Sequence, residues 1–243
     1  SRFNWDLIAN MPSRRPSQAG IQSALTGSLW TIVLVAVFIV PVGVAAAVYL
    51  EEYADNTTRF NRMIELNIQN LAAVPSIIYG ILALGVIARG FLGFGESILT
   101  GAIALGLLVL PVVIISGREA IRAVPGSIRA GSLALGASKW QTTWRMVLPN
   151  ALPGMATGTI LALSRAIGEA APLILLGGLS YITFNPEGVF SSFTVLPIQI
   201  FNWVSRPQAA FKANAAAGIL VLLALLLTMN AVAVVLRDRA QRK

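Results

Sequence analysis

The chain has 243 residues, of which 56% are hydrophobic and only 12% are charged, and its formal net charge is +8. A soluble domain normally carries about twice this fraction of charged residues, so the composition argues against a soluble globular fold. Cysteine and histidine are both absent from the sequence. Their absence excludes disulfides, thiolate metal sites, cysteine nucleophiles and histidine general bases.

Long stretches without a charged residue predict several membrane-spanning helices. These stretches cover residues 16–50, 66–88, 97–117, 146–164 and 213–236. A helix needs about 20 apolar residues to cross the hydrocarbon core of a bilayer. The shortest stretch continues past two charged residues to residue 178, and so reaches that length. The stretches do not alternate apolar with polar residues, as membrane strands would. The predicted fold class is an all-α membrane protein.

In chain order, five spans are expected at residues 26–50, 66–88, 97–117, 152–178 and 213–236. An external segment, residues 1–25, precedes them, and a cytoplasmic tail, residues 237–243, follows. The first span contains Pro41 and the second contains Pro75. Proline is tolerated in membrane helices because neighbouring groups satisfy the carbonyl that loses its donor. In the fourth span, Gly154 and Gly158 have the spacing that lets two helices pack closely.

The distribution of lysine and arginine predicts which ends of the spans are cytoplasmic. Segments 51–65, 118–149 and 237–243 hold eleven of the eighteen basic residues, whereas the segments on the opposite side hold six. This bias places the C-terminus in the cytoplasm and, with five spans, residue 1 outside. The positive charge is therefore explained by membrane topology and requires no nucleic-acid partner.

The predicted cytoplasmic loop, residues 118–149, has a pattern of its own. The Pro-Gly pair at 125–126 breaks one helix, and Gly136 ends or kinks the next. Ser138 is suited to cap a short helix that begins near Lys139. The loop is therefore expected to contain a separate short helix.

This short helix carries two large aromatic side chains. Trp140, Trp144 and Val147 are spaced so that they fall on one helix face, and Pro149 is expected to end the helix. From the pattern alone two interpretations stay open. The helix could lie flat in the headgroup region of the membrane. Alternatively, it could dock onto a soluble partner with its tryptophans as hot spots.

The loop resembles the EAA loop of bacterial ABC importer permeases. That pattern is Glu-Ala-Ala, three residues, Gly, nine residues, Ile, one residue and Leu-Pro. This sequence keeps the spacing, with Gly136, Met146, Leu148 and Pro149 at the later positions, whereas Ala130 replaces the glutamate. The resemblance implies that the loop forms a coupling helix seated in an ATPase subunit. The coupling residues implied in this way are Arg129, Gly136, Ala137, Lys139, Trp140, Trp144, Leu148 and Pro149.

The fourth span contains two ionisable residues in an apolar stretch, Arg165 and Glu169, which share a helix face. An ionisable residue at the centre of a membrane helix costs about 2.5–3.5 kcal/mol on insertion scales, so both should face the bundle or a water-filled path. One interpretation is a structural pair that holds helices together. The other is a substrate pathway, in which the guanidinium of Arg165 contacts an oxyanion, Glu169 partly neutralises it, and Ser164 adds a hydroxyl.

Four segments in order resemble the phosphate-specific importer permeases of the PstA type. They are AAVYLEEYA (46–54), VPSIIYG (74–80), SRAIGEAAPL (164–173) and LPIQIFNW (196–203). The similarity runs from about residue 20 to residue 239. It implies a type I ABC importer transmembrane domain over residues 26–236. It also implies six spans, with the first upstream of residue 1.

This resemblance implies a permease subunit that imports inorganic phosphate by alternating access. The implied partners are a PstC-type permease, a PstB-type ATPase dimer and a phosphate-binding protein. The chain has no phosphate-binding loop motif and no catalytic constellation. It is therefore expected to be a transport subunit without a cofactor of its own, while the partner ATPase uses ATP and magnesium. The expected location is the bacterial cytoplasmic membrane. Alternatives are a permease for phosphonate, sulfate or molybdate, and a secondary transporter or channel.

Overall fold

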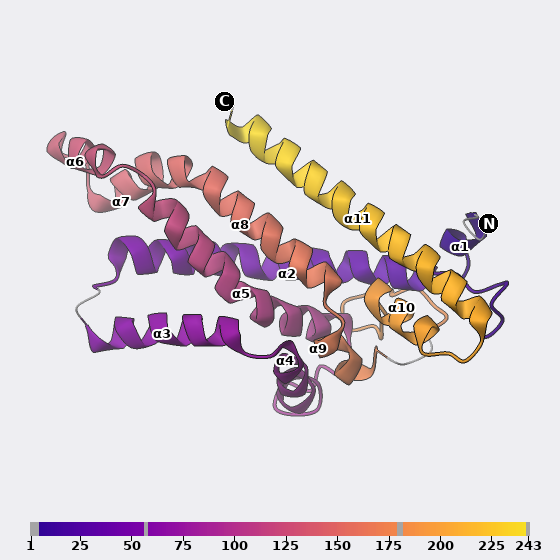
Figure 1. The fold of residues 1–243 in the computed structure, drawn as a ribbon. Coiled ribbons are helices and arrows are strands. Elements are labelled where there is room, and N and C mark those ends of the chain that lie inside the picture. Colours follow the sequence, from indigo (N-terminus) through magenta and orange to yellow (C-terminus); the bar gives the residue numbers. More distant parts are fainter. Residues whose placement is uncertain (1–4, 56–57, 179–181, 242–243) are drawn as a thin grey trace. The chain divides into compact units, whose positions relative to one another are not determined.

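A computed structural model describes residues 5–55, 58–178 and 182–241, and these residues form helices and no strands (Figure 1). The α-helices are α1 (Trp5–Ala9), α2 (Gln22–Val48), α3 (Arg59–Ala73), α4 (Ser76–Leu82), α5 (Ile98–Arg122), α6 (Gly126–Ala134), α7 (Lys139–Thr142), α8 (Leu148–Gly168), α9 (Ala171–Leu173), α10 (Leu196–Val204) and α11 (Ala209–Gln241). π-helical turns follow α2, α4, α7 and α9, at Tyr49–Tyr53, Ala83–Ala88, Thr143–Val147 and Ile174–Gly178. The prediction of an all-α protein is confirmed. Residues 1–4 of the expected external segment and 242–243 of the expected tail lie outside the described residues.

Within the described ranges, four helical stretches are long and apolar enough to cross a membrane. They are Gln22–Tyr53, Ile98–Arg122, Lys139–Gly168 and Ala209–Arg239. A fifth is added if Arg59–Ala73 and Ser76–Ala88 together form one span.

The second expected span, residues 66–88, is two helices rather than one continuous helix. α3 ends at Ala73 and α4 begins at Ser76. Between them the backbone of Val74 is extended, with φ −68° and ψ 133°. Proline disfavours the helical region for the residue before it, so Pro75 accounts for the break.

The chain divides into two compact units, each assembled from three stretches of sequence. Unit 1 comprises Ser1–Ala36, Pro75–Leu107 and Arg165–Met229, and unit 2 comprises Val37–Val74, Leu108–Ser164 and Asn230–Lys243. Four of the five divisions between them fall inside α2, α5, α8 and α11, and the fifth falls between α3 and α4. Each of these long helices therefore contributes residues to both units.

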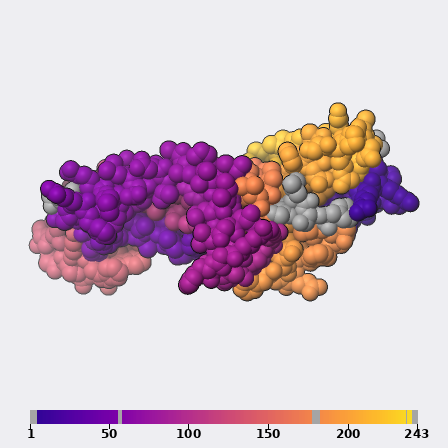
Figure 2. All heavy atoms as spheres, turned by 90° about the horizontal axis from the view of Figure 1, so that it is seen from below, coloured from indigo at the N-terminus to yellow at the C-terminus, as the bar shows by residue number. Residues whose placement is uncertain are grey.

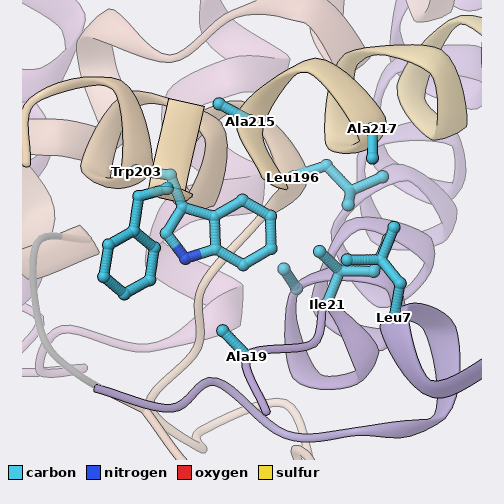
Figure 3. Packing of buried hydrophobic residues seen from close by; sticks show 9 residues of the cluster. Leu7, Ala19, Ile21, Leu196, Trp203, Ala215 and Ala217 are labelled. Carbon is cyan, nitrogen blue, oxygen red and sulfur yellow. The ribbon is translucent and has the colours of Figure 1, made fainter. Parts of the chain in front are cut away.

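Unit 1 contains an apolar cluster around Trp203, whose side chain is fully buried (Figure 3). Leu196 joins it from the same helix, α10, Phe211 comes from α11, and Ile21 from the segment before α2. Large aromatic side chains dominate the energetics of such cores. Pro197 lies in the first turn of α10, where its missing N–H leaves no hydrogen bond unmade.

Unit 2 is packed through small residues on α5 and α8. A Cβ added at Gly154 would lie 2.7 Å from the Cβ of Ala120, and one added at Gly158 would overlap the side chain of Ser116. The prediction that these two glycines serve helix packing is confirmed. Close backbone approach suits membrane helices, which gain no hydrophobic driving force against lipid.

Polar contacts join α8 to α11 within unit 2. The Ser164 hydroxyl lies against Asn230 Oδ1, and Arg237 Nη1 donates to the Thr157 hydroxyl at 2.9 Å. Thr157 and Ser164 are seven residues apart, and so are Asn230 and Arg237. The two contacts therefore fix one antiparallel register between these helices.

α3 lies at the surface of unit 2. None of its residues is buried, and the helix lies at the surface along its length, violet in Figure 2. Its side chains alternate between apolar and polar kinds, including Met63, Asn67 and Asn70. Thr58 caps its start, since the Thr58 hydroxyl accepts from the backbone N–H of Asn61.

Candidate substrate pathway and coupling segment

Arg165 and Glu169 lie where α8 ends. The helix stops at Gly168, and Ala170 precedes the three-residue helix α9. Arg165 Nε and Glu169 Oε1 are 3.6 Å apart, which makes a loose ion pair rather than a hydrogen bond of good geometry. The Arg165 side chain is 47% exposed and that of Glu169 is 22% exposed. The guanidinium, with five N–H donors, thus keeps part of its surface accessible.

α4 packs closely against α9, which follows this end of α8. A Cβ at Gly80 would lie 2.5 Å from the carbonyl oxygen of Pro172, so only glycine lets the two backbones approach this closely. The neighbouring Tyr79 is buried, and it interacts electrostatically with Arg165. Sequence analysis singled out segment 74–80 only for its resemblance to PstA-type permeases. In the structure its Tyr79 lies beside Arg165, the arginine of the predicted pathway.

Glu169 lines a small cavity in unit 1. Ser28 and Thr31 of α2 line the same cavity, whose volume is about 10 Å³. That volume is close to the minimum needed to hold one water molecule. The Ser28 hydroxyl also accepts a hydrogen bond from the backbone N–H of Leu196 at 2.9 Å. The polar side chains that line this cavity together with Glu169 therefore both come from α2.

Ser164 was expected to add a hydroxyl to the pathway. Its Oγ lies 2.8 Å from the carbonyl oxygen of Ile160 and also contacts Asn230 of α11. The described contacts of this hydroxyl are therefore one hydrogen bond within α8 and one contact with α11, both in unit 2. Among the residues that the structure describes, no group of three acidic side chains is arranged to hold a metal ion.

The turn between α6 and α7 is built by two local motifs. Gly136 has a φ of +83°, which favours glycine, and its N–H bonds the carbonyl of Leu133 while Ala137 bonds that of Ser132. This is the Schellman arrangement at a helix C-terminus. Ser138 and Gln141 then form a capping box at the start of α7. The predicted end at Gly136 and start at Lys139 are confirmed.

The two tryptophans of this segment face outward. Trp140 and Trp144 are 60% and 50% exposed, and their rings meet edge to face with centroids 5.4 Å apart. Val147 is 1% exposed, so the prediction that it shares their face is wrong. The π-helical turn at Thr143–Val147 widens the helix and changes the direction in which Val147 points.

The prediction that Pro149 ends the short helix is also wrong. Helical structure continues from Lys139 to Gly168. A proline ring clashes with the carbonyl four residues earlier in an α-helix, and here that carbonyl belongs to Arg145, inside the π-helical turn Thr143–Val147. The wider turn relieves the clash and lets the helix pass through the proline.

Two of the expected coupling residues point inward. Leu148 belongs to a buried apolar cluster with Ala47, Ile121 and Met155. The Arg129 side chain is only 25% exposed and is paired with Glu52. Ala137 is half-buried, whereas Gly136, Lys139 and Pro149 are exposed beside the tryptophans.

Carboxylates at the end of α2 were missed as individual site residues. Glu51 pairs with Arg118 and Arg122, and Glu52 pairs with Arg129. The side chains of Glu51 and Glu52 are 15% and 10% exposed. Two adjacent acids directly after a long apolar run were the available signal, because such charges need partners when they are buried.

Comparison with known proteins identifies the family and the fold of this chain. Residues 39–242 match the family model described as "Binding-protein-dependent transport system inner membrane component". The inward-facing structure of the MetNI methionine ABC transporter has the same fold, with a TM-score of 0.69 and 17% identity. That match covers 91% of this chain and 94% of that one.

Close sequence relatives come from mycobacteria. A protein of Mycobacterium tuberculosis named "Phosphate transport system permease protein PstA 1" is 37% identical over 92% of this chain and 72% of its own length. A Mycobacterium leprae protein named "Phosphate transport system permease protein PstA" is 35% identical over 100% of this chain and 79% of its own length. This chain belongs to the family of binding-protein-dependent transport system inner membrane components, as a multi-pass permease subunit of the PstA type.

Proposed function

We propose that this chain imports inorganic phosphate across the bacterial cytoplasmic membrane, as one permease subunit of an ATP-driven transporter that works by alternating access. The observation that carries the proposal is the Arg165–Glu169 pair, an ion pair of 3.6 Å at the end of a long apolar helix. The names of the mycobacterial relatives support phosphate as the substrate.

The arginine is suited to an oxyanion in transit. A guanidinium donates parallel hydrogen bonds to neighbouring oxygens, and it stays charged in any surroundings. Glu169 compensates the charge of Arg165 while no anion is present, and their loose contact requires little rearrangement when an anion arrives. The helix breaks before α9, and there the backbone of Gly80 packs directly on that of Pro172. α4 therefore supports the segment that carries Glu169.

The exposed face of residues 136–149 supports docking of a nucleotide-hydrolysing partner. Trp140 and Trp144 present an apolar surface, and Lys139 and Arg145 add positive charge around it. The proposed assembly contains a PstC-type permease, a PstB-type ATPase dimer that uses ATP and magnesium, and a phosphate-binding protein. In this arrangement the C-terminus and the docking segment lie in the cytoplasm.

Replacement of Arg165 tests the substrate proposal. We expect Arg165→Gln to reduce ATP-dependent phosphate uptake by about 100-fold or more, because the pathway loses its charged donor to the anion. The complete complex is reconstituted in proteoliposomes, and subunit co-purification verifies that it still assembles. Arg165→Lys is the matched control, which keeps the charge but loses the planar fork and should retain partial uptake.

Three results would contradict the proposal. One is normal uptake by a correctly assembled Arg165→Gln complex. Another concerns the uptake of labelled phosphate by the wild-type complex. The proposal is contradicted if phosphonate, sulfate or molybdate inhibits this uptake at concentrations where unlabelled phosphate does not. A third is uptake by vesicles containing this chain alone, driven by an ion gradient and indifferent to ATP.

A further inference from the structure

The π-helical turn at the end of α2, Tyr49–Tyr53, binds arginines from two other helices. Glu51 accepts hydrogen bonds from Arg118 Nε at 3.3 Å and from Arg122 Nε and Nη2, both at 2.9 Å. Glu52 accepts from Arg129 Nε at 3.0 Å and Nη2 at 2.7 Å. These short, charge-assisted contacts attach the end of α2 to α5 and α6.

Arg129 also binds the end of α5 directly. Its Nη1 donates to the carbonyl oxygen of Val124 at 2.7 Å, and its Nη2 donates to that of Ile121 at 2.8 Å. The last carbonyls of an α-helix have no partner within the helix, and a cation there also complements the helix dipole. One guanidinium thus joins α2, through Glu52, to the C-terminal end of α5 and to α6.

A second contact joins the same turn to α7. The Nζ of Lys139 lies 5.3 Å from the centroid of the Tyr53 ring, a cation–π geometry. α7 is in turn held to α6 by a hydrogen bond of 2.9 Å between the hydroxyls of Ser132 and Thr142. α6 and α7 are therefore both attached to residues 49–53, while Trp140 and Trp144 remain exposed.

We propose that residues 49–53 together with Arg129 form a transmission joint, which passes movement of the docking segment to α2 and α5 at the same time. The inference rests on the proposed function, since it needs an ATPase that moves α6 and α7. Arg129 and Glu52 act as positioning residues: they touch neither nucleotide nor the transported ion. Their side chains are 25% and 10% exposed, so their contacts are directed into the protein.

The joint explains why the arginine beside the EAA-type loop faces inward. Arg129 was expected to contact the ATPase, but its guanidinium is occupied by a carboxylate and two carbonyls. Each of these groups is held within a helix end that is itself fixed by tertiary contacts. A multidentate contact of this kind transmits displacement better than a single flexible side chain, because fewer rotamers remain available to absorb it.

The test measures coupling in the complete complex. In proteoliposomes we expect Glu52→Gln to raise the number of ATP molecules hydrolysed per solute ion imported by about tenfold, a typical magnitude for coupling between sites. The ATPase subunit should co-purify normally, since Trp140 and Trp144 are unchanged. Glu52→Asp should restore part of the coupling. The matched control is Glu96→Gln, which removes another ion pair, with Arg89 at 2.6 Å, that belongs to unit 1 and not to the joint, and it should leave the ratio unchanged.

A second variant covers the case in which Glu52→Gln fails to assemble. Tyr53→Leu removes the cation–π contact with Lys139 but keeps an apolar side chain, and should raise the same ratio by about threefold. The joint is refuted if Glu52→Gln assembles with a wild-type ratio, or if it fails to assemble and Tyr53→Leu has a wild-type ratio. Failure of the proposed function is distinguishable, because it appears already in the wild-type complex. That complex would then import its solute without ATP, or import another ion and not phosphate.

Discussion

Around Trp203 the chain is held by apolar side chains packed in unit 1, whereas around Glu51 it is held by carboxylates and guanidinium groups in unit 2. Apolar packing is non-directional and tolerates small shifts. Ion pairs with buried carboxylates are directional, and they become costly as soon as one partner is removed. The first region is therefore suited to stability, and the second to holding three helix ends in one defined geometry.

The largest expected effect comes from the apolar region. We expect Trp203→Ala to lower the free energy of unfolding by about 3–5 kcal/mol, because it leaves a cavity in a fully buried cluster. Unfolding in mixed micelles measures this loss, which should not depend on salt. Phe201→Ala is the control, because Phe201 lies on the same helix with its side chain 46% exposed. An equal loss there would contradict the assignment of the stabilisation to the buried cluster.

A smaller effect is expected in the charged region. Glu51→Gln should lower the free energy of unfolding by about 1.5–3 kcal/mol, the usual loss for hydrogen bonds to charged groups. Arg118, whose side chain is only 9% exposed, would retain Glu65 as its remaining partner. Glu119→Gln is the control, since that carboxylate is 64% exposed and such pairs contribute about 0–1 kcal/mol. Equal losses in both variants would show that burial does not matter here.

The turn at Gly136 provides a third test that concerns backbone alone. Gly136→Ala should cost about 1–2 kcal/mol, because a residue with a Cβ is strained at φ +83°. Gly131→Ala is matched to it: a Cβ at either glycine would meet nothing within 4 Å. Because Gly131 lies inside α6, its replacement should instead stabilise by about 0.5–1 kcal/mol. Effects of the same sign at both positions would contradict the Schellman assignment.

The smallest effect is expected between α8 and α11. Asn230→Ala removes the partner of the Ser164 hydroxyl and should cost about 0.6 kcal/mol, the average for hydrogen bonds between membrane helices. The same unfolding assay in micelles detects it. Asn67→Ala is the control, since the Asn67 side chain donates to Met63 of its own helix, and a larger loss there would be inconsistent with a register fixed by Asn230.

The features that sequence predicted correctly are local. Four apolar runs, the cap of α7 at Ser138 and the glycine packing in α8 each depend on residues close in sequence. The errors at Val147 and Pro149 have one cause, the π-helical turn Thr143–Val147. A periodicity of 3.6 residues cannot anticipate such a turn, because the turn changes the period itself.

The joint depends on pairing that no local pattern encodes. Glu51 and Arg118 are 67 residues apart, and Glu52 and Arg129 are 77 residues apart. Sequence identified Arg165 and Glu169 because they are four residues apart, although α8 ends at Gly168 and Glu169 lies just beyond it. It did not place Tyr79 beside them, since that contact depends on the approach of α4 to α9.

The turn at Gly136 has a consequence for the proposed docking of a partner on residues 136–149. A loop that became ordered only on capture would lose about 1–2 kcal/mol of backbone entropy per residue at each encounter. Here the Schellman bonds and the Ser138–Gln141 capping box already fix the turn in the single chain. A partner that docks here, as proposed, would therefore meet a pre-organised surface, which favours rapid association.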